Sequence, residues 1–178
     1  ERSFYKLWEI IFYFNLIPLD QTNFLSVSLA EKDGSFLRAI LEYRNKFGKA
    51  SDVKKDHYCL ITKSNDSKSD NIISECITKW NSSIFKYKSK ANELNDETND
   101  DADLTNANTI KNFIKFVIKN KKNANLITCN GDVNTNNEVD IYKILLGEII
   151  TSINIQAKGG NLVIKLFDTF TKPTLKLI

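Results

Sequence analysis

The residue that most suggests chemistry is Lys165, which lies inside the apolar segment NLVIKLF. A lysine in such a segment is unusual for a structural core, because burying an unpaired ammonium group is energetically costly. Titratable groups in unusual surroundings concentrate at functional sites. The position of Lys165 therefore favours a functional role over a purely structural one.

A second candidate is the turn AEKDGSF at residues 30–36, which follows a predicted strand. Gly34 would let the backbone approach a ligand closely, and Ser35 beside it adds a small polar side chain. The turn lacks the full set of glycines that cradles a dinucleotide. Taken alone it is only a weak indication of a cofactor site.

Hydrolytic and zinc chemistry have little support in this sequence. The single histidine, His57, precedes a predicted strand, whereas a catalytic base is expected beyond the carboxyl end of one. The three cysteines, Cys59, Cys76 and Cys129, show no Cys-x-x-Cys spacing and cannot all pair within one chain. The sequence therefore predicts no metal ion and a reducing, cytoplasmic location.

The composition is that of one soluble domain. The 178 residues carry a net charge of +3, with 42% hydrophobic and 26% charged residues, so binding of nucleic acid by bulk charge is not indicated. No apolar run is long enough to span a membrane. The absence of methionine leads us to expect further sequence before Glu1, and the lack of a stop signal near Ile178 suggests the same behind it.

Hydrophobic spacing predicts alternating helices and strands. Spacings of three and four predict helices over 4–14, 36–47, 72–80, 110–118 and 139–155. Short apolar segments predict strands over 23–30, 58–62, 125–129 and 161–167, and Gly159-Gly160 is expected to cap the last helix. The alternation predicts an α/β three-layer sandwich with a mostly parallel sheet, whose ligands bind beyond the carboxyl ends of the strands.

Two charged segments can be explained as ordinary solvated surface. Residues 89–102 are rich in aspartate and glutamate and are expected to form an acidic loop. The helix at 110–118 carries Lys111, Lys115 and Lys119 on its outer face. That face is either ordinary solvated surface or a contact for an RNA backbone.

Several segments, in order, resemble the FtsJ-like (RrmJ-type) S-adenosylmethionine-dependent RNA ribose 2'-O-methyltransferases, especially their viral and eukaryotic cap-methylating branch. KGGNLVIKLFDTFT is similar to that branch's Gly-Gly-x-Phe/Leu-Val-x-Lys strand, AEKDGSFLRAI to its cofactor turn and TCNGD to its Ala-Asp-Gly-Gly segment. YCLIT, DADLTNANTIKNF and FYKLWEI resemble three further family segments. The resemblance runs from about residue 4 to about residue 171 and implies a Rossmann-like methyltransferase fold.

The resemblance also implies residue roles. The family removes the proton of the ribose hydroxyl with a Lys-Asp-Lys-Glu tetrad, in which Lys165 would be the general base and Lys6 would orient the hydroxyl. Asn130 stands where the family has the tetrad aspartate, and Asp132 could compensate for its missing charge. The tetrad glutamate would lie beyond Ile178.

The same resemblance assigns the cofactor site. Glu31, Gly34 and Ser35 would lie along the methionine part of S-adenosylmethionine, and Asp103 would accept a hydrogen bond from the adenine. Asp103 could instead cap the helix that follows it. The family's Pro-Gly-Gly is replaced by Asp33, Gly34 and Ser35, which adds a carboxylate and a side chain where the cofactor's own carboxylate should approach.

Two functions follow from the resemblance and its departures. The domain is either an RNA 2'-O-methyltransferase whose partner is RNA, including capped mRNA, or an inactive methyltransferase-fold subunit that binds RNA or serves as a scaffold. Because the family's sheet continues past the Lys165 strand, we also expect a partner chain or a further segment to cover the edge at 161–167.

Overall fold

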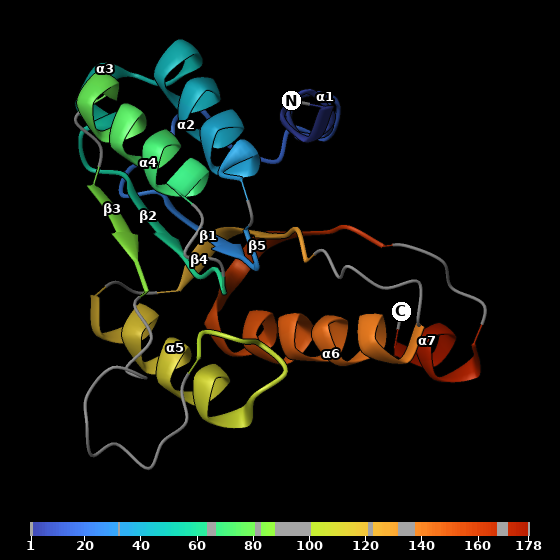
Figure 1. Ribbon diagram of the computed structural model, residues 1–178. Helices are drawn as coiled ribbons and strands as arrows, with labels where there is room; N and C mark the ends of the chain where they lie inside the picture. Colours follow the sequence, from blue (N-terminus) through green and yellow to red (C-terminus); the bar gives the residue numbers. More distant parts are fainter. Residues whose placement is uncertain are drawn as a thin grey trace, which may run out of the picture.

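The computed structural model contains a sheet in which all neighbouring strands run parallel (Figure 1). It describes residues 2–31, 33–63, 67–80, 83–87, 101–120, 123–131, 138–166 and 171–177. The strand order is β3-β2-β1-β4-β5. The strands are β1 (Leu25–Leu29), β2 (His57–Leu60), β3 (Ser83–Lys86), β4 (Ala124–Cys129) and β5 (Gln156–Ile164).

Helices cover both faces of this sheet, which gives the three predicted layers (Figure 1). One layer holds α1 (Arg2–Phe14), α2 (Ser35–Phe47), α3 (Ala50–Val53) and α4 (Ser67–Trp80), and the other holds α5 (Ala107–Asn120), α6 (Glu138–Ile155) and α7 (Lys172–Leu177). Successive strand residues point to opposite faces, so Tyr58 packs with the first layer and Cys59 with the second. The predicted α/β sandwich is therefore confirmed.

The segment around Gly159 differs from the prediction. Strand β5 begins at Gln156, directly after α6 ends, so Gly159-Gly160 lie inside the strand and do not cap the helix. A Cβ atom on Gly160 would come within 2.7 Å of the Ala124 carbonyl oxygen, which explains glycine where β4 and β5 shift register. The strand predicted over 161–167 thus starts earlier and ends at Ile164, and residue 167 lies outside the described residues.

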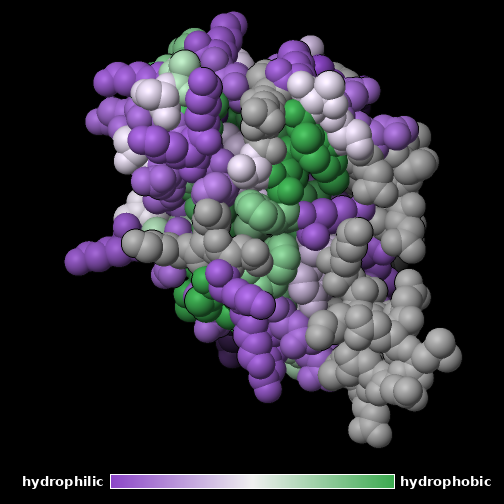
Figure 2. Space-filling model, turned by 90° about the vertical axis from the view of Figure 1, so that its left-hand side faces the viewer, coloured by the Kyte–Doolittle hydropathy of each residue, from purple (hydrophilic) through white to green (hydrophobic). Residues whose placement is uncertain are grey.

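The two outer strands of the described sheet are β3 and β5. The sequence does not predict β3, whose side chains are only half-buried and which pairs with β2 from Ser83 to Lys86. On this side, hydrophobic side chains gather within a largely hydrophilic surface (Figure 2). The predicted cover over the β5 edge stays a prediction, and the acidic loop lies outside the described residues up to residue 100.

A buried ion pair holds together the segments that lead into the amino-terminal ends of β1 and β2. The Arg44 guanidinium of α2 donates to both carboxylate oxygens of Asp56, at 2.7 and 3.0 Å, and both side chains are fully buried. The same guanidinium donates to the carbonyl oxygens of Pro18 and Gln21, while Asp56 also accepts the N–H of Phe24. One arginine thus joins α2 to the α1–β1 connection and to the start of β2.

The satisfied network makes Arg44 a stability determinant. Arg44→Met should leave Asp56 charged and unpaired in the interior and lower the free energy of unfolding by about 3–5 kcal/mol. Arg38→Met on the same helix is the control, because its ion pair with Glu42 is partly exposed and should be worth under about 1 kcal/mol. Urea unfolding measures the loss of unfolding free energy in both variants. Equal losses would show that the buried Arg44–Asp56 pair stabilises the fold no more than the partly exposed Arg38–Glu42 pair.

Candidate functional site

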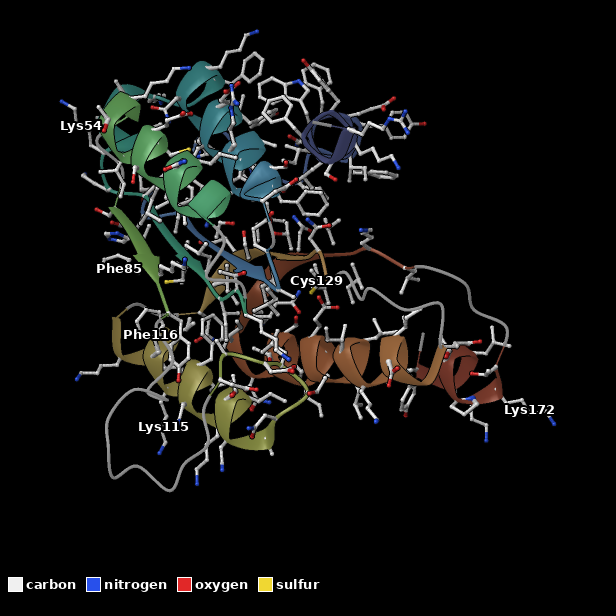
Figure 3. All side chains as sticks on the ribbon, viewed as in Figure 1. Lys54, Phe85, Lys115, Phe116, Cys129 and Lys172 are labelled. Carbon is white, nitrogen blue, oxygen red and sulfur yellow. The ribbon has the colours of Figure 1, made fainter. Side chains whose placement is uncertain are left out.

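The sheet order creates a topological switch point between β1 and β4. The chain leaves β1 toward β2 and β3 and later returns to the other side of β1 with β4. Ligands of parallel α/β sheets bind outside the carboxyl ends of the strands at such a point. Glu31 follows β1 and Asn130 follows β4, whose last residue, Cys129, is labelled in Figure 3. Two predicted site residues therefore meet at this position.

Glu31 and Asn130 contact each other directly. The Asn130 side-chain amide donates to Glu31 Oε1 at 3.4 Å, and both residues are buried. Backbone hydrogen bonds hold them in place, because the Asn130 N–H donates to Leu29 and the Glu31 N–H to Ile61. An aspartate at position 130 would put a second acidic group against Glu31, whereas the neutral Asn130 side chain donates a hydrogen bond to it.

Burial keeps Glu31 uncharged at neutral pH. Its pKa is raised to about 8, first by burial and then by the negative charge of Asp33, while the bond from Asn130 offsets only part of the increase. Within the described residues, Glu31 Oε2 and Asn130 Oδ1 are buried without a hydrogen-bond partner. The switch point thus has two buried oxygen atoms without a described hydrogen-bond partner, one of them on a carboxyl group that holds its proton at neutral pH.

The turn that follows β1 leads directly into α2. Gly34 has φ 73°, a left-handed conformation that favours glycine, and a Cβ atom there would lie 2.8 Å from the Ile72 side chain of α4. The glycine therefore permits both the turn and the close packing of α2 against α4. Ser35, the first residue of α2, is buried. The turn therefore brings the amino-terminal end of α2 close behind β1.

The side chain of Asp33 occupies the amino-terminal end of α2. Its Oδ1 accepts the backbone N–H of Ser35 at 3.0 Å. Although burial raises the pKa of Asp33, the hydrogen bonds from Ser35 outweigh it and hold the pKa below its usual value. An ionised carboxylate of the chain thus uses a helix N–H group that could otherwise bind a ligand anion.

Asp103 lies beside the carboxyl end of β2 and is already paired. Its Oδ2 accepts a hydrogen bond from the Lys63 ammonium at 2.6 Å, and its Oδ1 accepts the N–H of Thr105. Asn106 caps α5 by accepting the N–H of Asn108, so the alternative that Asp103 caps this helix is wrong. To accept a bond from adenine, Asp103 would have to share its carboxylate with Lys63.

Lys165 follows the last residue of β5 and reaches the same edge of the sheet as Asn130. Its backbone N–H donates to the Cys129 carbonyl oxygen at 3.0 Å, one residue before Asn130. The residue is half-buried and lies just outside the strand in which the sequence predicts it. Glu31, Asn130 and Lys165 are therefore grouped around the ends of three adjacent strands, β1, β4 and β5.

Glu148 of α6 is a site residue that sequence reasoning does not identify. It is 2% exposed and its Oε1 accepts the Gly131 N–H at 3.0 Å. Burial raises the pKa of Glu148 to about 8, and the Gly131 bond and the positive charge of Lys165 lower it only in part. The sequence does hint at this residue, because Glu148 falls among the apolar residues that repeat along one face of its helix, where a charged side chain is unexpected.

Lys6 is not brought to this group in the same way. It lies exposed on α1, and the structure records no hydrogen bond between its ammonium and Asn130 in the ranges it describes. In those ranges no cluster of three or more metal-ligating acidic, histidine or cysteine side chains occurs. None of the helices there combines the length and apolar character needed to cross a bilayer.

The raised carboxyl pKa of Glu31 predicts a pH dependence of stability. The folded chain holds its proton up to about pH 8, whereas the unfolded chain loses it near the ordinary value of 4.5. The free energy of unfolding should therefore fall as pH rises from about 4.5 to about 8, by a few kcal/mol at most, and level off above that. Glu31→Gln should remove this part of the fall in urea unfolding.

A matched control for this test is Glu42→Gln on α2, because that carboxylate is partly exposed and paired with Arg38. It should leave the slope between pH 4.5 and 8 nearly unchanged. A Glu31→Gln variant with the slope of the unmodified chain would show that Glu31 is not buried in its uncharged form.

No family model and no curated protein sequence matches the chain. Among solved structures, the chain is similar to a Plasmodium falciparum protein described as a ribosomal RNA methyltransferase, with a TM-score of 0.51, 13% identity and coverage of 99% of this chain and 82% of that one. A second is an S-adenosylmethionine-dependent methyltransferase from Clostridium acetobutylicum, with a TM-score of 0.43, 14% identity and coverage of 90% and 49%. At 13% identity the likeness to the first structure concerns the fold alone, and it agrees with the Rossmann-like arrangement of the five parallel strands and their helices.

Proposed function

We propose that this domain binds S-adenosylmethionine at the switch point between β1 and β4 and catalyses methylation of a ribose 2'-hydroxyl of RNA. The fold supports the proposal, as do the positions of Glu31, Asn130 and Lys165 at the ends of neighbouring strands. The observation that carries it is the pair of buried oxygen atoms at the switch point, Glu31 Oε2 and Asn130 Oδ1, which have no hydrogen-bond partner among the described residues.

These oxygen atoms fit the amino end of the cofactor. The methionine part of S-adenosylmethionine carries an ammonium group with N–H donors, which Asn130 Oδ1 could accept and which Glu31 Oε2 could accept once its carboxyl group loses its proton. An ammonium beside Glu31 would also favour the ionised carboxylate and lower its pKa. The residues present at the end of β1 and β4 are therefore suited to this half of the ligand.

The carboxylate end of the cofactor fits less well. In a site of this kind the ligand anion is bound by the first N–H groups of the helix after β1. Here Asp33 already accepts the Ser35 N–H and is ionised, so a ligand carboxylate would meet a like charge. We infer that the domain binds S-adenosylmethionine weakly.

Lys165 would take the proton in the transfer step. The bound cofactor supplies a methyl group attached to a positively charged sulfur. When the ribose oxygen forms its bond to that carbon and the carbon–sulfur bond breaks, the hydroxyl proton must leave, and a neutral Lys165 amine would accept it. The positive charge of Lys165 lowers the pKa of buried Glu148 in part, so the two side chains lie near each other.

One prediction from this proposed function concerns Asp33. Replacing Asp33→Pro together with Ser35→Gly, or Asp33→Asn alone, should strengthen S-adenosylmethionine binding by roughly tenfold or more, because the like charge is removed. Isothermal titration calorimetry measures the effect. Asp33→Asn keeps an oxygen that can cap α2, so it separates the charge from the helix cap.

Asp20→Asn is the control, because it also removes a carboxylate but lies exposed before the amino-terminal end of β1, away from the switch point. It should leave affinity unchanged. Tight binding by the unmodified chain, with no gain in the Asp33 variants, would show that the Asp33 carboxylate does not oppose the carboxylate of the cofactor.

The second prediction tests the base. Lys165→Ala should reduce methyl transfer to RNA by roughly 10²–10⁴-fold while leaving RNA affinity and folding nearly intact, because a general base acts mainly in the transition state. Lys158→Ala, which removes an exposed lysine of β5, the strand that leads to Lys165, should have no effect. Transfer of a labelled methyl group to capped and uncapped RNA measures the rates and shows which RNA is the substrate.

Activity that persists in Lys165→Ala would show that another group is the base. No transfer by the unmodified chain, or by the variant with the repaired cofactor turn, would favour the other function considered for this fold. The domain would then be an inactive subunit that binds RNA or serves as a scaffold.

A further inference from the structure

Helix α1 carries a second ordered row of side chains on the face turned away from the core. Phe4, Leu7 and Ile11 are buried on its inner face. The residues of the opposite face are all exposed and recur at spacings of three and four, namely Arg2, Tyr5, Lys6, Glu9, Phe12 and Tyr13. These six residues form one continuous surface, which we call the outer stripe of α1.

The outer stripe exposes more aromatic surface than a solvated helix needs. Tyr5 is 65% exposed, Phe12 is 64% exposed and Tyr13 is 80% exposed. Large rings gathered on one helix face mark an interaction site, whereas single exposed apolar residues do not. Helix α1 lies at the rim of its layer and packs mainly on α2, through the Trp8 and Tyr43 rings (Figure 1). None of the described elements covers the outer stripe.

The charges of the outer stripe limit the kind of partner that fits it. Arg2 and Lys6 lie in the first half of α1, and Glu9 follows one turn later. An anionic surface would attract the two cations but would meet the Glu9 carboxylate beside them. An apolar segment would hold all three charges against hydrocarbon, which is unfavourable. A fitting partner therefore carries rings and charges of its own, arranged in the reverse order.

We propose that the outer stripe of α1 binds the outer stripe of a second copy of this chain, with the two helices antiparallel about a two-fold axis. In such an interface residue i of one copy faces residue j of the other, and j faces i. When Lys6 faces Glu9 of the second copy, Glu9 faces Lys6 in return. A parallel pairing would instead place each charge opposite the same charge, which is repulsive.

The same register also pairs the aromatic residues. Arg2 and Tyr13 are centred on the same point of the helix as Lys6 and Glu9, so Arg2 faces Tyr13 of the second copy. A guanidinium over a tyrosine ring is a favourable cation–π contact. Tyr5 and Phe12 lie on one flank of the stripe, and Tyr5 comes within one helical turn of Phe12 of the second copy. All six residues thus gain a complementary neighbour in one arrangement.

The available area predicts a weak dimer. A fully covered aromatic side chain buries roughly 150–250 Å². With exposures of 64% to 80%, the three rings offer roughly 400 Å² per copy, or about 800 Å² per pair, and the stems of Arg2 and Lys6 add to this. This total approaches the lower end of specific interfaces, about 1,200 Å². We therefore expect a dissociation constant on the order of 10 μM.

The interface is independent of the proposed methyl transfer. It uses none of the residues at the switch point, such as Glu31, Asn130 and Lys165. The structure also leaves Lys6 exposed and does not group it with Asn130. A dimer without methyl transfer and methyl transfer without a dimer are therefore distinguishable results.

Sedimentation velocity of the chain at concentrations from about 1 to 200 μM measures the dimer directly. Tyr13→Ala should raise the dissociation constant by roughly tenfold or more, because it removes the most exposed ring of the stripe from both halves of the interface. Ile153→Ala is the matched control, since it removes an apolar side chain that is 71% exposed on α6. It should change the dissociation constant by less than about twofold.

Reversal of the two charges tests the antiparallel register. Lys6→Glu and Glu9→Lys should each weaken the dimer by roughly tenfold or more, because each places like charges opposite each other twice. An equimolar mixture of the two variants should restore association, because each variant then presents to the other the opposite charge at both positions. Mixing leaves the sequence of each helix unchanged, so an effect within one helix cannot produce this rescue.

Three results would overturn the proposal. A chain that stays monomeric at all concentrations would show that the outer stripe does not bind a second copy. A dimer weakened by Ile153→Ala and not by Tyr13→Ala would place the interface elsewhere. A mixture of Lys6→Glu and Glu9→Lys that stays monomeric would exclude the antiparallel pairing.

Discussion

Arg44 holds together the parts of the molecule that position the site. Its guanidinium is fully buried and binds Asp56 before β2 and two carbonyl oxygens of the α1–β1 connection. This contact fixes the second half of α2 against the amino ends of the strands. Because α2 is rigid, its first turn must then lie over the carboxyl end of β1, where Asp33, Gly34 and Ser35 form the turn. Helix α1 also packs on α2, through the Trp8 and Tyr43 rings, so its position depends on the same anchor.

The buried carboxyl groups of the proposed site hold their protons at neutral pH, whereas the carboxyl group at the helix end is ionised. Glu31 and Glu148 are buried with pKa values of about 8, and Asn130 between them is neutral, so the floor of the switch point carries little negative charge at neutral pH. The ionised carboxylate is Asp33, at the helix end. The two halves of the methionine part of a cofactor would therefore meet different surroundings, with acceptors at one end and a like charge at the other.

The sequence predicts the alternation of elements well because hydrophobic spacing directly reports burial on one helix face or in one strand. It misses β3, whose SIFK is half-buried at the sheet edge, and it misplaces Gly159-Gly160, which are required by a close approach to Ala124 and not by a helix end. The site could be predicted only as strand-end residues. The Arg44–Asp56 pair, the pairing of Asp103 with Lys63 and the contact of Glu148 with Gly131 join residues distant in sequence, and no local pattern records such contacts.

The central claim is that the cofactor turn retains the position for an ammonium group but fills the position for a carboxylate with Asp33. The most direct test compares the affinities of the chain for S-adenosylmethionine and for its decarboxylated form, which keeps the ammonium and lacks the carboxylate. The account predicts that the decarboxylated form binds at least as tightly, and that Asp33→Asn improves only the binding of the carboxylated form. Clearly tighter binding of S-adenosylmethionine by the unmodified chain would contradict the account, because it would show that the carboxylate position is open.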